Sequence, residues 1–133
     1  MTIRKVGAGV MKHPAEISVI EKAEKVLGMR LPMELRERYL RDNSGALVIE
    51  SGEWTLIPLP DSSTSEANAR TERNMFSIAL EVKSWSVGFP ETGYPFAEDG
   101  AGNFALIMLD RSGYWDWDND TRDTSPISKI LWT

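Results

Sequence analysis

The sequence predicts a single α+β domain, residues 1–133, in which helices flank a largely antiparallel sheet of about five to six strands. The chain has the length of one ordinary domain, and 41% of its residues are hydrophobic. Apolar residues recur at helical spacing near the N-terminus and occur in short runs between turn residues further on. No repeat or linker divides the chain, so one core is expected.

Two helices are expected to follow a flexible N-terminal segment, residues 1–13. Pro14 suits the first turn of a helix, and Gly28 is placed to end that helix in a left-handed conformation. The apolar stripe between them consists of Ile17, Ile20, Ala23, Val26 and Leu27. This spacing predicts a first helix that reaches from Pro14 to Leu27.

The second helix of the pair is expected to begin at Pro32 and to end before the turn 43–45. Its buried face is predicted to consist of Leu35, Tyr39 and Leu40. The charged residues predicted to face water are Arg36, Glu37, Arg38 and Arg41. The helix is therefore amphipathic, with one face available for packing.

A β-hairpin and a polar loop are expected next. The short apolar runs 46–49 and 54–59 indicate two strands, and residues 50–53 indicate the turn between them. Pro60 ends the second strand, and the following residues are polar without an apolar period. Residues 60–73 are therefore expected to form a long surface loop.

The remaining residues predict a middle helix, three strands and a short C-terminal helix. The helix near residues 73–85 is indicated by Met75, Ile78, Ala79, Val82 and Trp85. Strands are expected over 96–97, 104–109 and 114–118. Ser125 is placed to cap the last helix, with Pro126 at its first position. The apolar face of that helix would consist of Ile127, Ile130 and Leu131.

Charge is distributed unevenly along the chain. Residues 1–45 carry nine Lys/Arg and six Asp/Glu, which gives a charge of +3. Residues 46–133 carry six Lys/Arg and fourteen Asp/Glu, which gives −8, so the net charge of the chain is −5. An acidic surface disfavours nucleic acid as a partner, because binding to a duplex relies on cationic contacts with phosphates. The same charge favours a basic protein partner, although an acidic surface that only faces water would give the same charge pattern.

The chain contains no cysteine, which excludes disulfides, thiolate metal sites and cysteine nucleophiles. The basic N-terminal stretch lacks an apolar core long enough for a signal peptide, and no apolar run is long enough to span a membrane. A cytoplasmic protein without a membrane partner is therefore expected.

The stretch 100–105, GAGNFA, formally matches the glycine fingerprint of dinucleotide-binding loops. Such a loop must open a helix, so that main-chain N–H groups meet the pyrophosphate. Here six apolar residues follow the glycines before the next turn, which indicates a buried strand. We therefore expect a tight turn over 99–103, with glycines at positive φ and Asp or Asn side chains capping it, and no cofactor.

The stretch 116–120, DWDND, places acids at the first, third and fifth positions of a calcium-binding loop. The sixth position is Thr121 instead of glycine, and the twelfth is Ile127 instead of glutamate. Strand alternation accounts for the stretch better, because it places Trp115 and Trp117 on one face of a strand. The opposite face would carry Tyr114, Asp116 and Asp118.

Catalytic groups are few. A Ser-His-Asp set would have to use His13, the one histidine, which precedes a helix and is expected to be exposed. Seven acids lie between Glu98 and Asp123, so a pair of carboxylates for glycosidase-like chemistry stays open.

Four phrases, taken in order, resemble the SMI1/KNR4 family, the core of the SUKH superfamily. They are IEKAEKVLGMRLPMELRERYLRDNSG (20–45), EWTLIPL (53–59), the glycine hairpin at 95–103 with the apolar strand that follows it, and GYWDWDND (113–120). The resemblance covers roughly residues 14–132. It departs from the family in a Ser between the usual Asn and Gly at 43–45, in a shorter C-terminal helix and in the segment 60–75.

The resemblance implies an α+β domain that is not an enzyme. Bacterial members of the family are interpreted as immunity proteins that bind and neutralise a cognate toxin, and fungal members as regulators of cell-wall synthesis and signalling. The family supplies no catalytic residues to transfer.

The leading hypothesis is therefore a bacterial immunity protein whose acidic face binds a basic toxin domain. The charge pattern, and not the family, selects the residues expected to bind the partner: Glu98, Asp99, Asp116, Asp118, Asp120 and Asp123, with Tyr114 as an aromatic anchor. A small carboxylate-dependent hydrolase or sugar-binding protein is the alternative, and a cytoplasmic adaptor is a third. The sequence names neither the toxin nor the oligomeric state.

Overall fold

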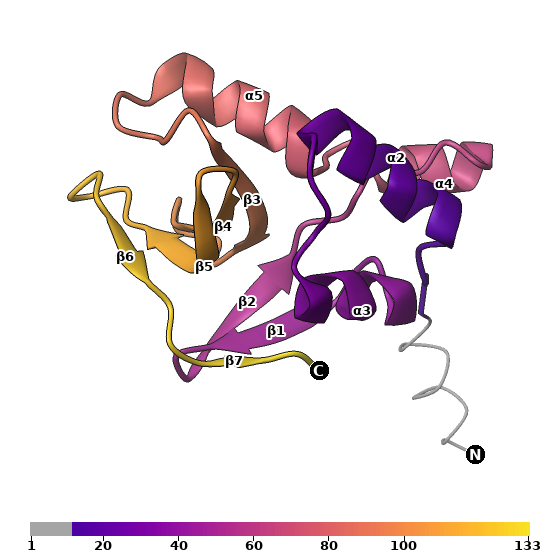
Figure 1. The fold of residues 1–133 in the computed structure, drawn as a ribbon, viewed down its shortest axis with the longest axis horizontal. Coiled ribbons are helices and arrows are strands. Elements are labelled where there is room, and N and C mark those ends of the chain that lie inside the picture. Colours follow the sequence, from indigo (N-terminus) through magenta and orange to yellow (C-terminus); the bar gives the residue numbers. More distant parts are fainter. Residues whose placement is uncertain (1–11) are drawn as a thin grey trace.

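The computed structural model describes residues 12–133, along which pairs of helices precede runs of strands (Figure 1). The helices are α2 (Ile17–Leu27), α3 (Met33–Arg41), α4 (Ser65–Arg70) and α5 (Met75–Trp85). The strands are β1 (Ala46–Ile49), β2 (Gly52–Leu56), β3 (Gly93–Glu98), β4 (Phe104–Met108), β5 (Arg111–Trp117), β6 (Thr124–Pro126) and β7 (Ile130–Leu131). The α+β class is confirmed, and the described part has seven strands where five to six were predicted.

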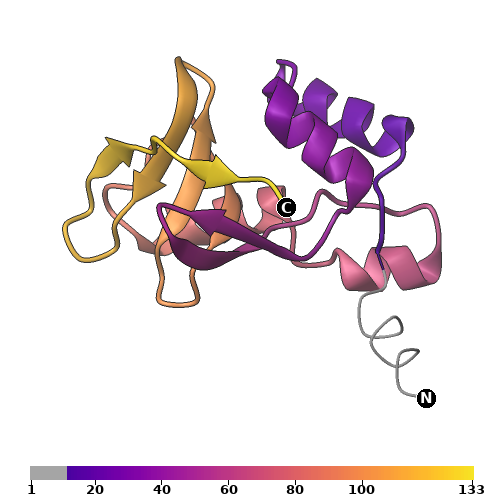
Figure 2. The ribbon, with the colours of Figure 1, turned by 90° about the horizontal axis from the view of Figure 1, so that it is seen from below.

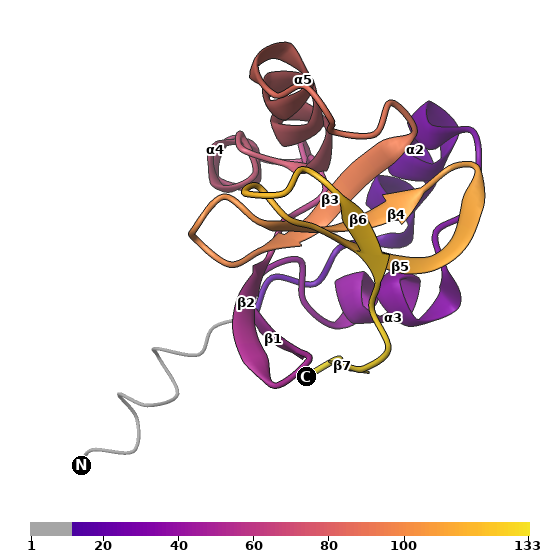
Figure 3. The ribbon, with the colours of Figure 1, turned by 90° about the vertical axis from the view of Figure 1, so that its left-hand side faces the viewer.

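All seven strands belong to one antiparallel sheet with the order β6-β5-β4-β3-β2-β1-β7. The two outermost strands follow each other in the chain, and only residues 127–129 connect them. A link of this length spans roughly 14 Å at most, so the two edges of the sheet must approach each other. The sheet is therefore curled, as Figures 1 and 3 show.

The prediction of a C-terminal helix is wrong, because residues 124–131 contain the strands β6 and β7 instead. Ser125 and Pro126 pair with β5 instead of capping a helix, and Ile130 and Leu131 pair with β1. Between them, the N–H of Ile127 donates to the main-chain oxygen of Tyr114 at 2.9 Å. A helix of one or two turns is marginal by itself, whereas pairing with both sheet edges satisfies these main-chain groups.

The first helix begins at Ile17, three residues later than predicted, and ends at Gly28 as expected. Gly28 has a φ of 78°, the left-handed conformation that favours glycine at this position. The buried face consists of Val19, Ile20, Ala23 and Leu27. Ile20, Ala23 and Leu27 are thus buried as predicted, whereas two other members of the predicted stripe, Ile17 and Val26, are exposed.

Helix α3 buries Leu35 and Tyr39 as predicted, but the placement of Arg38 in water was wrong. Its side chain is 3% exposed and donates hydrogen bonds to the main-chain oxygens of Asp42, Ser44 and Thr133. These carbonyl groups replace the water that a guanidinium would otherwise need. The sequence pattern alone could not show that the chain returns over this side of α3.

The expected surface loop 60–73 contains the short helix α4. The Thr64 hydroxyl oxygen accepts a hydrogen bond from the N–H of Ala67, and Ala67 is the helix's buried residue. A helix with a single buried residue has no apolar period, which is why the prediction missed it.

The middle helix α5 is confirmed, and Asn74 caps it by accepting from the N–H groups of Phe76 and Ser77. Trp85, predicted on its buried face, is exposed.

Strand β4 is buried at all five positions. Trp117 packs against Phe89 and Phe104 in the core, whereas Trp115, on the same face of β5, is half-buried.

Residues 1–11 of the expected flexible segment lie outside the described residues. His13, expected to be exposed, is half-buried. Its N–H donates to the Asp42 carboxylate at 3.0 Å, and its carbonyl oxygen accepts from the N–H of Asn43 at 2.7 Å. The end of that segment is therefore fixed to the end of α3.

Candidate functional site

The cross-strand neighbours of Asp116 are small side chains. Across the strands it pairs with Ala105 on β4 and Ser125 on β6, and Ala105 pairs with Ala97 on β3. Residues paired in this way point to the same face of a sheet. The two alanines therefore leave the Asp116 carboxylate half-buried beside short neighbours instead of covering it.

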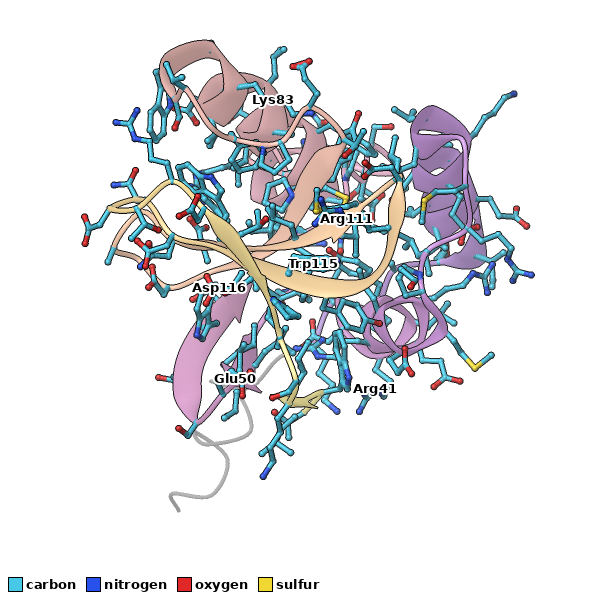
Figure 4. The ribbon with its side chains drawn as sticks, turned by 60° about the vertical axis from the view of Figure 1, so that its left-hand side comes forward. Arg41, Glu50, Lys83, Arg111, Trp115 and Asp116 are labelled. Carbon is cyan, nitrogen blue, oxygen red and sulfur yellow. The ribbon has the colours of Figure 1, made fainter. Side chains whose placement is uncertain are left out.

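Other carboxylates surround Asp116. Burial raises its pKa, and the negative charges of Asp118, Asp99 and Glu50 raise it further. Figure 4 shows Asp116 on β5 and Glu50 at the tip of the β1–β2 hairpin on the same side of the molecule. We call the surface formed by Glu50, Asp99, Asp116 and Asp118, with Asp120 and Asp123 on the adjoining turn, the acidic surface.

Asp99 holds the glycine turn together, as the sequence predicted. Its carboxylate accepts hydrogen bonds from the N–H of Ala101 at 2.8 Å, the N–H of Asn103 at 3.2 Å and the Asn103 amide at 2.8 Å. Burial opposes ionisation, but these three donors outweigh it and lower the pKa of Asp99. Gly100 and Gly102 have φ values of 84° and 90°, which confirms the predicted positive φ.

Asp118 holds the turn that follows β5. Its carboxylate accepts from the N–H groups of Asp120 and Thr121 at 2.8 and 3.3 Å. Asp120 and Asp123 are exposed on this turn. The Asn103 side-chain oxygen accepts from the N–H of Asn119 at 2.9 Å, so the turn is tied to the glycine turn. The structure therefore brings five of the six predicted acids together.

Glu98 is the predicted acid that lies elsewhere. It pairs with Phe104 on β4, which pairs with Trp117 on β5, so its side chain points to the face opposite Asp116. There it forms a two-pronged ion pair with Arg73, whose Nη2 atom lies 2.8 Å from Oε1. Its charge is thus neutralised within the chain.

Tyr114, the predicted aromatic anchor, is half-buried in a cluster with Phe96 and Trp132. Its hydroxyl donates to the Glu34 carboxylate at 2.9 Å. Burial, followed by that hydrogen bond, raises the pKa of the Tyr114 hydroxyl. The ring therefore joins β5 to α3, and only part of it can face a partner.

Glu50 belongs to the acidic surface, although the sequence analysis assigned it only to a turn and not to the site. It has a φ of 49°, and Ser51 has a φ of 71°, so both adopt the left-handed conformation of a two-residue hairpin turn. The Glu50 carboxylate accepts from the N–H and hydroxyl of Ser128 at 2.8 and 3.0 Å, and its pKa is lowered. No sequence signal could have shown this contact, because the curl of the sheet creates it.

A shallow hollow of about 530 Å³ lies beside Glu50, between the hairpin tip and β7. Its lining residues are Val48, Glu50, Ser51, Lys129 and Leu131. Carboxylates facing each other across an enclosed cavity would favour the hydrolase hypothesis. In the part of the chain that the structure describes, the acidic surface instead lies open, and only one of its carboxylates borders this hollow.

Within residues 12–133 no group of three or more His, Asp or Glu side chains has the arrangement needed to hold a metal ion. The glycine turn leads into β4 and not into a helix, so its main-chain N–H groups do not form the helix N-terminus that a pyrophosphate requires. No helix in the same range is long and apolar enough to cross a membrane.

A model described as the SMI1 / KNR4 family (SUKH-1) matches residues 14–129, nearly the whole chain. The chain belongs to this family. The match confirms the family that the four sequence phrases indicated. It includes all six residues of the acidic surface and the segment 60–75, which departs from the family pattern in the sequence comparison. A comparison with curated proteins finds no match. Membership in the SUKH-1 family is compatible with an immunity-protein role.

Proposed function

We propose that this SUKH-1 domain is a bacterial immunity protein that neutralises a basic toxin domain by binding it through the acidic surface. The main support for the proposal is the surroundings of the Asp116 carboxylate, which lack, within residues 12–133, both a hydrogen-bond donor and a positive charge. Among the described residues none donates a hydrogen bond to its carboxylate, and the nearest charges are other carboxylates. A half-buried anion in this position gains from a cation that a partner supplies.

The neighbouring acids support the proposal in a different way. Asp99 and Asp118 are fixed by hydrogen bonds from their own turns, so their charges hold defined positions without a cation. A preorganised charge loses little side-chain entropy on binding. Asp120 and Asp123 are exposed beside them and extend the negative field toward an approaching partner.

The charge of the sheet half of the chain agrees with such a partner. Residues 46–133 carry a net charge of −8, and a basic toxin would be steered toward them at a rate that falls with added salt. Nucleases with phosphate-binding clefts are one class that meets this requirement, because carboxylates can occupy the positions of phosphates. Such a protein would meet its toxin in the cytoplasm, the location that the sequence predicts.

The first experiment identifies the partner. The tagged chain would be used to capture proteins from the native strain, and mass spectrometry would identify those retained. The captured protein would then be coexpressed with the chain, and the growth of the host measured. We expect a basic toxin domain whose toxicity the chain suppresses in proportion to its expression.

The second experiment tests the surface with matched variants. Asp116→Lys/Asp123→Lys reverses two charges on the acidic surface, and Glu37→Lys/Glu91→Lys reverses two exposed charges outside it. The first pair should weaken binding by tenfold or more and flatten the dependence of affinity on salt. Equal affinities and equal salt slopes for the two double variants would rule out the acidic surface as the toxin-binding site.

A further inference from the structure

A second hollow, of about 440 Å³, lies between α2 and the segment that leads through α4 to the start of α5. Figures 2 and 3 show α2 and α4 standing apart, on different sides of the segment that joins β2 to α4. The residues that line this groove are Lys22, Ala23, Lys25, Val26, Pro60, Asp61, Ser62, Asn68 and Phe76. None of them belongs to the acidic surface.

The groove offers apolar surface to a ligand. Ala23 is buried and has the smallest side chain of the α2 core face, which leaves room above it. Val26 is 69% exposed, although it was expected in the core, and Phe76 on α5 is half-buried. Pro60 adds a rigid apolar wall. An exposed apolar side chain beside a hollow lined by other apolar groups is typical of an interaction site.

The charged residues that line the groove are two lysines and one aspartate, so their net charge is positive. Lys22 and Lys25 are exposed on its α2 side. The one lining acid, Asp61, is already engaged, because its carboxylate accepts from the hydroxyl and N–H of Ser63 at 2.6 and 3.0 Å. Lys22 and Arg70 also lie close enough to lower the pKa of Asp61, after the larger effect of Ser63.

We propose that this groove binds an acidic segment of a partner protein that inserts one apolar or aromatic side chain between α2 and Phe76. The acidic groups of that segment would pair with Lys22 and Lys25, and Val26 and Pro60 would contact the inserted side chain. Nucleic acid fits less well, because two lysines supply few phosphate contacts and the groove is largely apolar.

This inference does not depend on the proposed toxin. The acidic surface on the sheet selects a basic partner, whereas the groove on the helices selects an acidic one. The chain could therefore hold two partners of opposite charge at once, through separate elements of the fold. A protein that only occludes a toxin needs just the first of these surfaces.

The test is a selection from a displayed library of random 12-residue peptides against the whole chain. The Lys22→Glu/Lys25→Glu variant serves as the counter-target. A matched control, Arg30→Glu/Lys129→Glu, makes the same change in net charge at exposed positions outside the groove. Circular dichroism would establish that both variants are folded.

We expect enriched peptides to combine two or more acidic residues with an apolar or aromatic residue. They should bind the Lys22→Glu/Lys25→Glu variant at least tenfold more weakly and the control within twofold of the wild type. Val26→Ser, which leaves the core intact because this side chain is exposed, should also weaken binding. Amide NMR shifts on adding a peptide should centre on residues 22–26, 61–62 and 76.

Three results would overturn the inference. They are enriched peptides without an acidic bias, equal loss of affinity in the two double variants, and amide shifts centred outside the groove. A single-stranded 12-nucleotide DNA that binds the groove more tightly than the peptides would contradict it as well.

Discussion

The Nε atom of Arg38 lies 2.9 Å from the main-chain oxygen of Thr133, a residue 95 positions later in the chain. The same guanidinium donates to the main-chain oxygens of Asp42 and Ser44. Burial lowers the pKa of Arg38, and the nearby Asp42 carboxylate opposes that change. One buried cation therefore joins α3, the turn before β1 and the segment that closes the sheet.

We expect Arg38→Met to destabilise the fold strongly. It keeps much of the side-chain volume but leaves buried carbonyl oxygens without donors, which costs on the order of 3 kcal/mol. Urea unfolding followed by circular dichroism would measure the loss. Arg38→Lys, which keeps the charge but fewer of the hydrogen bonds, should fall between the wild type and Arg38→Met.

Arg41→Met is the matched control for this prediction. Arg41 donates to the Trp132 oxygen from an exposed position, so its loss should cost only about 0.5 kcal/mol. Equal losses for the two methionine variants would mean that Arg38 does not hold the fold through its buried hydrogen bonds.

The glycine turn gives a second comparison. An alanine Cβ at Gly100 would meet no atom within 4 Å, so Gly100→Ala should cost about 1 kcal/mol, from its positive φ alone. At Gly102 the added Cβ would also lie 3.2 Å from the side-chain amide nitrogen of Asn119. Gly102→Ala should therefore cost more and should weaken the contact between the two turns. The reverse order of unfolding free energies would contradict the geometry of the turn.

These tests concern features that sequence reasoning predicted unequally well. The turn over 99–103 was predictable, because glycine at positive φ and a capping Asp or Asn are local requirements. Helix α5 was predictable from its apolar period, and the hairpin from two short apolar runs on either side of a turn, which are local patterns too. Local pattern also grouped Asp116 with Asp118 through strand alternation and excluded a dinucleotide loop through the strand that follows the glycines.

What the sequence could not show depends on the curl of the sheet. Arg38 has the pattern of an exposed charge until the chain returns over α3, and residues 124–131 resemble a short helix until two sheet edges are available to them. Glu50 joins the acidic surface because Ser128 reaches it from the other end of the sheet. Glu98 leaves that surface because strand pairing turns it toward Arg73. Each of these outcomes is set by residues distant in the chain.

The hairpin tip predicts a stabilising change. Ser51 has a φ of 71°, which a residue with a Cβ adopts at a cost of roughly 1–2 kcal/mol. Ser51→Gly should relieve most of that cost and raise the melting temperature by a few degrees, because glycine favours two-residue hairpin turns of this type. Ser62→Gly is the control, because Ser62 is exposed and its φ is not positive. This change should leave the melting temperature unchanged or lower it slightly. A lower melting temperature for Ser51→Gly would mean that the strain at this tip is negligible.

Asp116 and Asp99 should respond to pH with opposite signs. The folded state raises the pKa of Asp116, so this group binds protons more readily when folded. Its destabilising effect grows as pH rises from the ordinary carboxyl pKa to the folded one and is complete above the folded pKa. Asp116→Asn should therefore be more stable than the wild type at pH 7, and the gain should vanish on acidification below the ordinary carboxyl range. The folded state lowers the pKa of Asp99, so its contribution is complete above the ordinary carboxyl pKa and is lost as pH falls through the folded one. Asp99→Asn should then be less stable at pH 7 and equal to the wild type in strong acid.

The same pair connects stability with the proposed function. If Asp116 is kept for binding a partner's cation, Asp116→Asn should gain stability and lose affinity for the toxin, which is the trade-off expected of a binding residue. Asp99→Asn should lose stability because it disturbs its own turn, with a smaller loss of affinity. Urea unfolding at pH 3 to 8 and a binding titration at pH 7 would measure both quantities. A destabilised Asp116→Asn at neutral pH would contradict the electrostatic origin of the site, because it would mean that the fold itself needs this charge.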